Sequence, residues 1–257
     1  MRSGLNIAAL LCAIVAAVAL PGASYAQLKV FSSGGFRAPL SEVLPEFERT
    51  TGIKITTTWA PSQGNYSNTI GRRLARGENA DVVVMSKEGL NDLVAEGRIS
   101  RGSEIDIAQT PLAVAVRAGA NAPDISSVDA FKKLLLSAKT VVFPGSTGGI
   151  YLETILFPKL GIAEDLARKT IHGRGDVALF KGDAEVAIQP ASELIQESGI
   201  QYVGPIPAEI QFISVFTAAI VDGSSEQQAG RRLIEYLASD RVLAALRKSG
   251  MEPVKIR

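Results

Sequence analysis

Two glycine-rich turns hold the polar groups best suited to bind a small molecule. The first turn, Ser33 to Phe36, follows an expected strand, and the second, Ser146 to Gly149, follows another strand more than 100 residues later. A helix is predicted after each turn. The first N–H groups of a helix have no partner inside it and the helix dipole is positive there, so both features attract an anion. The two turns together predict two lobes that face one anionic ligand.

Further polar side chains are expected close to these turns. Arg37 directly follows the first turn, and a guanidinium can hold a carboxylate through two hydrogen bonds. Gln189 follows a predicted strand, at the carboxyl end where ligands of open α/β sheets bind. Competing structural roles are turn geometry for the glycines, helix capping for Ser62 or Asn65, and simple exposure for Arg37. The candidate ligand-binding residues are Ser33, Gly34, Gly35, Phe36, Arg37, Ser62, Gln63, Asn65, Ser146, Thr147, Gly148, Gly149, Tyr151 and Gln189.

Candidates for acid–base chemistry are few. His172 is the only histidine, and an imidazole exchanges protons near neutral pH, although a solvated loop histidine is the competing interpretation. Tyr151 is the other candidate. The only cysteine, Cys12, lies in the first 26 residues, and one histidine without cysteines cannot build a typical zinc site. We therefore predict no metal and no cofactor.

The first 26 residues have the pattern of a secretory signal peptide. Arg2 precedes an apolar run from Leu5 to Leu20, and Ser24 and Ala26 supply the small residues of a cleavage site. The run is short for a membrane span, which needs about 20 residues, so we expect cleavage rather than anchoring. The remaining chain has 26 basic and 26 acidic residues, which argues against a nucleic-acid partner. We expect a monomer in the periplasm, with no membrane span after cleavage.

Strand-like and helix-like segments alternate through the rest of the chain, which predicts an α/β fold with helices covering parallel sheets. Long apolar strands near 111–117 and 211–221 are expected to cross between two lobes, as a hinge beside a ligand cleft. We predict lobe one at residues 27–113 and 211–257, and lobe two at residues 114–210. The predicted helices cover residues 39–51, 65–76, 87–96, 128–138, 150–160, 164–170, 177–181, 191–197, 225–238 and 241–249.

Several stretches carry a family resemblance, namely Leu28–Phe36, Leu44–Gly52, Arg73–Ser86, Gly148–Leu152 and Gly182–Ala187. They resemble periplasmic solute-binding proteins of the type II class, and within it the molybdate-binding-like group. The resemblance implies two α/β lobes, two crossing strands and a ligand held in the cleft between the lobes. It also implies a partner, the permease of an ABC transporter.

The chain departs from the molybdate-binding pattern at three places. Those proteins carry serines where this chain has Gly35 and residues 60–66, and a tyrosine where it has Gln189. Losing these hydroxyl groups argues against molybdate and favours an organic carboxylate. Residues 189–194 and 204–211 resemble a divergent subgroup, and a secreted enzyme type on this scaffold, aconitate isomerase, resembles that subgroup.

Two functions therefore compete. The leading expectation is a binding protein that captures a small organic anion for an ABC transporter, without turnover. The alternative is an isomerase of a tricarboxylic acid, in which His172, Tyr151 or a glutamate acts as the base and the glycine-rich turns hold carboxylates. An extracellular adhesin or co-receptor is a third class, and no feature of the sequence selects it.

Overall fold

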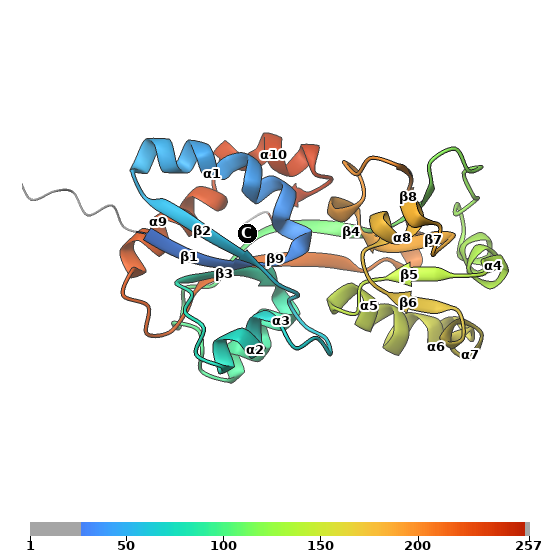
Figure 1. Ribbon diagram of the computed structural model, residues 1–257, viewed down its shortest axis with the longest axis horizontal. Coiled ribbons are helices and arrows are strands. Elements are labelled where there is room, and N and C mark those ends of the chain that lie inside the picture. The colour runs from blue at the N-terminus through green and yellow to red at the C-terminus, as the bar shows by residue number, and fades with distance from the viewer. Residues whose placement is uncertain (1–26, 255–257) are drawn as a thin grey trace, which may run out of the picture.

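Two strands carry the chain between the two halves of the molecule. β4 (Ile105–Arg117) and β9 (Ile213–Ile220) lie side by side and antiparallel, with Pro111 opposite Ile213. The computed structural model describes residues 27–254, and both strands run along the middle of an elongated molecule (Figure 1). We call the half built on β1, β2, β3 and β9 lobe one, and the half built on β5, β6 and β7 lobe two. The signal peptide predicted for residues 1–26 lies outside the described residues.

The strands form one continuous sheet in the order β2-β1-β3-β9-β4-β7-β5-β6, with β8 and β10 paired to β4. β1, β2 and β3 are mutually parallel, as are β5, β6 and β7, whereas β4 and β9 run antiparallel to their neighbours. β4 pairs with β9 through residues 105–111 and with β7 and β8 through residues 112–117. The other strands are β1 (Gln27–Ser32), β2 (Lys54–Trp59), β3 (Val82–Ser86), β5 (Val141–Phe143), β6 (Thr170–His172), β7 (Val186–Pro190), β8 (Ile200–Pro205) and β10 (Glu252–Pro253).

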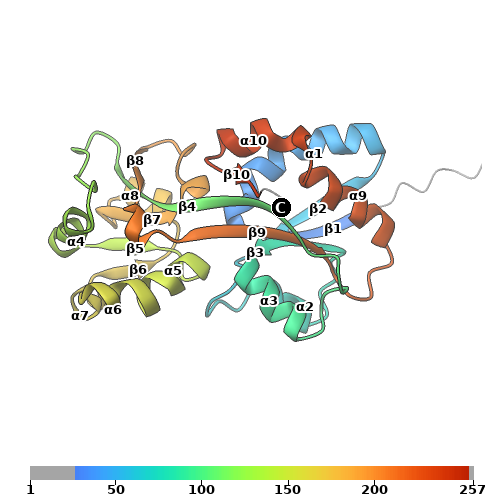
Figure 2. The same cartoon turned by 180° about the vertical axis from the view of Figure 1, so that it is seen from behind.

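Helices cover both faces of the sheet in lobe one. α1, α9 and α10 lie on one face and α2 and α3 on the other (Figure 2). α1 buries Leu40, Val43 and Phe47 and ends at Gly52, whose φ of 73° is the left-handed conformation that favours glycine after a helix. The helices of this lobe are α1 (Arg37–Thr51), α2 (Ile70–Ala75), α3 (Lys87–Ala95), α9 (Gln227–Leu237) and α10 (Leu243–Lys248), with 3₁₀ turns at Gly34–Phe36 and Asp240–Val242.

Lobe two repeats this arrangement with shorter helices. α5, a π-helical segment at Leu152–Leu156 and α6 follow one another without a break, and a 3₁₀ turn at Ala191–Glu193 directly follows β7. The helices of this lobe are α4 (Val128–Ser137), α5 (Thr147–Tyr151), α6 (Phe157–Leu160), α7 (Ala163–Ala167) and α8 (Gly175–Lys181), with a further 3₁₀ turn at Ala208–Ile210.

The alternation of side chains along the strands divides the core. Val82 and Val84 of β3 belong to one apolar cluster of lobe one, whereas Val83 and Met85 belong to another on the opposite face. β3 is buried along its whole length, as expected of a central strand covered on both faces. Lobe two has its own two clusters, so each lobe is stabilised by its own buried apolar residues.

The predicted two-lobed α/β architecture is confirmed, and the local differences have physical causes. The helix expected at residues 65–76 begins only at Ile70, because Thr69 rather than Ser62 or Asn65 accepts the capping hydrogen bond. β6 and β8 were not predicted, since β6 has three residues and β8 carries Gly204 and Pro205 at its end. The helix expected at 191–197 is a single 3₁₀ turn. None of the helices in residues 27–254 is long and apolar enough to cross a membrane.

Candidate functional site

A cavity of about 320 Å³ lies between the first glycine-rich turn and the segments that flank β7. Lobe one lines it with Gly34, Arg37 and Ala38. It lies at the carboxyl ends of β1 and β7, the edge of an α/β sheet where ligands bind. The residues that line it from lobe two are Arg174, Asp176, Gln189, Ser192, Glu193 and Glu197.

The first turn places its backbone against this cavity. The Ser33 N–H donates to the Val84 carbonyl at 2.8 Å, which fixes the turn beside β3. Gly35 has no room for a side chain, because a Cβ atom there would lie 2.5 Å from Phe216 Cζ and 3.3 Å from Glu193 Oε1. The carboxyl oxygen of Glu193 therefore lies directly over the turn that was predicted to hold an anion.

A chain of hydrogen bonds fixes Glu193. The Gly175 N–H donates to Gln189 Oε1 at 2.6 Å, and Gln189 Nε2 donates to Glu193 Oε2 at 2.7 Å. Gln189 is 2% exposed, and a Cβ atom at position 175 would collide with Gln189 Oε1, so the close approach requires glycine there. Both polar ends of the Gln189 amide are thus used within the protein, and Glu193 Oε1 is left facing lobe one.

Glu193 is a carboxyl group of this cavity whose pKa is raised toward neutral pH. The pKa of Glu193 is raised from 4.5 to about 7, mainly by burial and to a smaller extent by the charge of Asp176, whereas Arg174, Arg37 and the hydrogen bond from Gln189 oppose the rise. The Glu193 side chain is half-buried: protein atoms surround its carboxyl group closely, and part of its surface faces the cavity. A carboxyl group with this pKa can both accept and donate a proton near pH 7.

Two guanidinium groups supply positive charge to the cavity. Arg37 lies over the ring of Trp59, 4.8 Å from its centroid, which holds an otherwise exposed side chain in place. Arg174 Nε lies 3.1 Å from Asp176 Oδ1, and its Nη2 lies 3.9 Å from Glu197 Oε1. The hydrogen bonds that Arg174 donates to Asp176 raise the pKa of Arg174, so this guanidinium stays charged. The arginines come from different lobes and meet at one cavity.

Ser192 adds a hydroxyl group without a partner. Its side chain is 7% exposed, and Ser192 Oγ makes no hydrogen bond within the described residues. A buried hydroxyl left unpaired costs roughly 1–3 kcal/mol, so a ligand group that paired with it would offset this cost.

The second glycine-rich turn has different surroundings. Thr147 Oγ1 lies 2.7 Å from Ser86 Oγ and donates to Gln63 Oε1 at 3.0 Å. Tyr66 Oη accepts a hydrogen bond from the Gly145 N–H at 2.9 Å. Gly64, with a φ of 100°, packs so closely against the Gly145 carbonyl that a Cβ atom would collide with it. The loop after β2 therefore closes onto this turn, and the turn does not line the cavity that contains Glu193.

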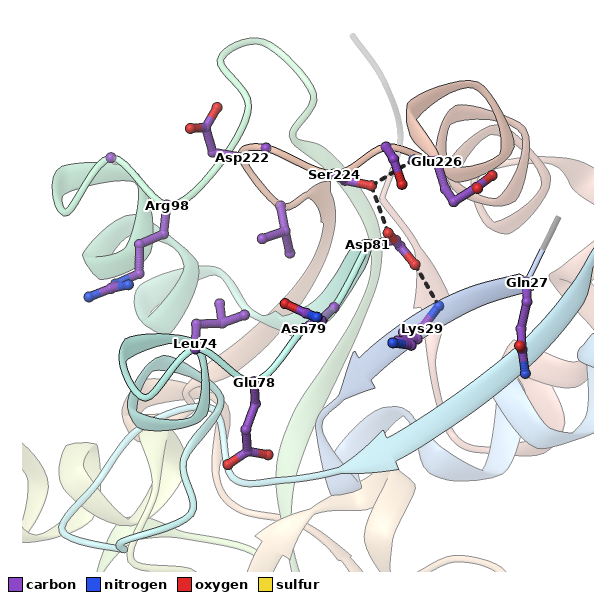
Figure 3. Close-up of a pocket in the computed structure, with 16 residues that line it drawn as sticks. Gln27, Lys29, Leu74, Glu78, Asn79, Asp81, Arg98, Asp222, Ser224 and Glu226 are labelled. Atoms are coloured by element: carbon purple, nitrogen blue, oxygen red, sulfur yellow. Dashed lines mark hydrogen bonds between the residues drawn. The ribbon is translucent and has the colours of Figure 1, made fainter.

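A larger cavity, of about 570 Å³, lies at the opposite end of lobe one (Figure 3). It is lined by the amino ends of β1 and β3 and by the loop after β9. Its central carboxylate is already satisfied, because Asp81 accepts hydrogen bonds from the Lys29 N–H and from Ser224 Oγ, both at 2.8 Å. No carboxyl end of a parallel strand opens into it. We therefore place the functional site at the cavity between the lobes.

A family model described as bacterial extracellular solute-binding protein matches residues 28–252. The chain belongs to this family. Aconitate isomerase of a Pseudomonas species is 39% identical over 230 residues, which cover 88% of each chain. The molybdate-binding protein ModA of Azotobacter vinelandii is 22% identical over 256 residues, which cover 95% of this chain and 97% of that protein.

Solved structures confirm the fold of this solute-binding protein. The periplasmic molybdate-binding protein of Azotobacter vinelandii superposes with a TM-score of 0.71 at 17% identity, covering 90% of this chain and all of that one. The sulfate-binding protein SubI of Mycobacterium tuberculosis has a TM-score of 0.71 at 18% identity, covering 90% and 88% of the two chains. The predicted membership of the type II, molybdate-binding-like group is thereby confirmed.

The structure places the predicted ligand residues of this solute-binding protein in three environments. Gly34, Arg37 and Gln189 line the cavity, and Gly35 lies beneath Glu193. A second contact between the lobes joins the second glycine-rich turn to the loop after β2. The predicted residues in this contact or close to it are Ser62, Gln63, Asn65, Ser146, Thr147, Gly148 and Gly149. In this group Ser62 Oγ accepts from the Ser86 N–H, and Asn65 is exposed and accepts from Arg72.

Three further predicted residues lie outside the cavity. The Phe36 ring is buried in the lobe-one core, 5.8 Å from the Phe216 ring, because the 3₁₀ turn directs it inward. Tyr151 stacks on Phe212 and donates to the Ile210 carbonyl at 2.9 Å, so its hydroxyl serves packing, and burial raises its pKa. His172 ends β6 at an exposed position, where Nε2 lies 2.9 Å from Glu153 Oε1. None of the three lines the cavity.

Sequence reasoning missed the residues from lobe two that complete the cavity, namely Arg174, Asp176, Ser192, Glu193 and Glu197. Arg174 and Asp176 lie between two predicted helices, where no ligand contact was expected, and Glu193 was expected in an ordinary helix. One signal was available, because Gln189 lies near the end of buried strand β7 and Glu193 directly after it, at the edge where ligands bind. Burial, which raises the pKa of Glu193, is not visible in the sequence.

Proposed function

We propose that this chain binds an unsaturated tricarboxylic acid of the aconitate type in the cavity between the lobes and isomerises it. The observation that carries the proposal is the position of Glu193. Its carboxyl group, which has a pKa of about 7, lies in the cavity with the first turn and two arginines. The 39% identical relative named aconitate isomerase supports the same chemistry. The periplasm is the proposed location, in keeping with the extracellular family description.

The proposed reaction moves one proton along an allylic system. Glu193 removes a proton from the methylene carbon, and the electron pair of that C–H bond forms the new double bond. The electrons of the old double bond pass into the adjacent carboxylate, whose charge the first turn and Arg37 stabilise. The electron pair then returns from that carboxylate to the adjacent carbon of the old double bond, which takes the proton back from Glu193, so atoms and electrons balance without a cofactor. During the reaction Glu193 starts ionised, holds the proton between the two steps, and is ionised again when the proton has been returned.

The surroundings of the first turn favour a carboxylate over molybdate. Phe216 and Glu193 occupy the space that a serine side chain at position 35 would need. An inorganic dianion would face the Glu193 carboxyl group directly, whereas the flexible arms of a tricarboxylic acid can spread between Arg37 and Arg174. A tricarboxylic acid carries more negative charge than Arg37 alone can balance, and Arg174 supplies the second positive charge.

Turnover tests the proposal directly. Purified protein is mixed with trans-aconitate in one sample and with cis-aconitate in another, and both isomers are followed by proton NMR. We expect the two samples to reach the same equilibrium ratio. The variant Glu193→Gln should lose activity by roughly 10²–10⁴-fold, the range for removing an acid–base group. Glu164→Gln, an exposed position at the start of α7, is the matched control and should keep full activity. Full activity in Glu193→Gln would refute the assigned role.

The second candidate function is capture of a small carboxylate for an ABC transporter without turnover. The match to solute-binding proteins across residues 28–252 favours it. A ligand that binds only the folded protein raises its melting temperature, so di- and tricarboxylates would raise it under both proposals. Such stabilisation without any interconversion of the aconitate isomers would select the binding protein over the isomerase.

A further inference from the structure

Gln189 lies near the end of β7, at the position where the resemblance to molybdate-binding proteins predicts a ligand contact. Both ends of its amide are engaged within the protein, because Oε1 accepts from Gly175 and Nε2 donates to Glu193. Gln189 lines the cavity but is only 2% exposed, so little of its surface is open to a ligand. A direct contact with ligand is therefore a poor account of this residue.

The hydrogen bond from Gly175 determines which way the amide points. A backbone N–H can only donate, so it selects the oxygen of Gln189 and turns Nε2 toward Glu193. Gly175 is buried, and the collision expected for any Cβ atom there shows that the two groups are pressed together. The orientation of the amide is thus fixed by the start of α8 and not by the ligand.

We infer that Gln189 is a positioning residue for the proposed reaction: its amide, oriented by Gly175, binds Glu193 Oε2 and keeps Oε1 directed at the first turn of lobe one. The inference rests on the proposed function, in which Glu193 transfers the proton. With Oε2 held, a single oxygen remains to reach the substrate, so the proton leaves and returns along one direction. An amide donor also favours the ionised form of the carboxyl group, which is the form that acts as a base.

Other charged groups act on Glu193 from every side and must stay constant in a test. Arg37 approaches from α1, Arg174 and Asp176 from the start of α8, and Glu197 from the segment after the 3₁₀ turn. Replacing Gln189 leaves all four in place. Gln189→Leu removes both hydrogen bonds, whereas Gln189→Glu keeps an acceptor for Gly175 and removes only the donor to Glu193.

The test measures Glu193 itself, by titrating its side-chain carboxyl carbon by NMR in protein labelled with ¹³C-glutamate. We expect the midpoint to move to higher pH in Gln189→Leu and further in Gln189→Glu, where a second carboxyl group adjoins the first. Gln201→Leu, on β8 and outside the cavity, is the matched control and should leave the midpoint unchanged. Since Gln189→Glu retains the bond to Gly175, it covers the case in which Gln189→Leu does not fold.

Kinetics of the same variants separates positioning from a general loss of structure. The acidic limb of the kcat profile should move to higher pH, so that kcat falls several-fold at pH 7 and recovers near pH 9, while KM changes little. An unchanged midpoint for Glu193 in both variants, or a loss of kcat that is equal at every pH, would overturn the inference. If the unaltered protein shows no turnover at all, the proposed function fails, and the NMR titration still decides whether Gln189 controls Glu193.

Discussion

The two glycine-rich turns look alike in sequence, and the structure gives them different surroundings. Both follow a parallel strand and both start a helix. The first turn, with Arg37 beside it, faces a cavity whose opposite side carries Glu193 and Arg174. The second is covered by the loop after β2, through Thr147, Gln63 and Tyr66. A turn that could bind an anion by its backbone geometry does so only if the facing segment leaves space, and that segment lies far away in the sequence.

The difference predicts that charge matters at the first turn more than at the second. Replacing Arg37 by Ala should weaken binding of tricarballylate, a saturated tricarboxylate that cannot isomerise, by roughly 10- to 100-fold, because a charge-assisted hydrogen bond contributes about 1.5–3 kcal/mol. Titration calorimetry measures this loss. Thermal unfolding should change little, since Arg37 is exposed and lies over the ring of Trp59. Unchanged affinity would remove the first turn from the ligand site.

The buried carboxyl group of Glu193 predicts a pH-dependent stability that nothing at the second turn should share. A carboxyl pKa raised from 4.5 to about 7 by burial means that the folded state holds this proton more tightly than the unfolded state. Stability therefore declines as the pH rises from about 4.5 to about 7, by on the order of 2 kcal/mol after allowing for partial exposure. Glu193→Gln should lack this decline and be more stable than the unaltered protein at pH 8.

Chemical denaturation at pH 5 and pH 8 checks this expectation, with Glu164→Gln as the control for loss of one surface charge. The same loss of stability with rising pH in Glu193→Gln would show that the raised pKa belongs to another group.

At the second turn, the smallest effect is expected. Tyr66→Phe removes the hydrogen bond from the Gly145 N–H and should lower the free energy of unfolding by about 1 kcal/mol. Affinity for tricarballylate should stay within about twofold, because the two contacts between the lobes share no residue. Denaturation and calorimetry on one preparation give both values. A large loss of affinity would show that the second turn also holds the ligand.

Sequence reasoning reached the scaffold more completely than the site. Buried strands such as β3 and helix ends such as Gly52 are set by local patterns, so they are predictable. The first turn, Arg37 and Gln189 were found because they follow strands at the ligand edge of the sheet. Glu193 was not found, since its pKa depends on burial between the lobes. Gln189 was predicted as a ligand contact, whereas we infer that it positions Glu193. Only the contact with Gly175 shows where its amide points, and this contact is not visible in the sequence.

The most direct measurement is a crystal structure of the protein with tricarballylate bound. The account predicts a ligand carboxylate within about 2.7–3.1 Å of a guanidinium nitrogen of Arg37, and another ligand atom beside Glu193 Oε1. The contact between Thr147 and Gln63 should remain as it is. A ligand held instead by residues 146–149, with the cavity around Glu193 empty, would contradict the account.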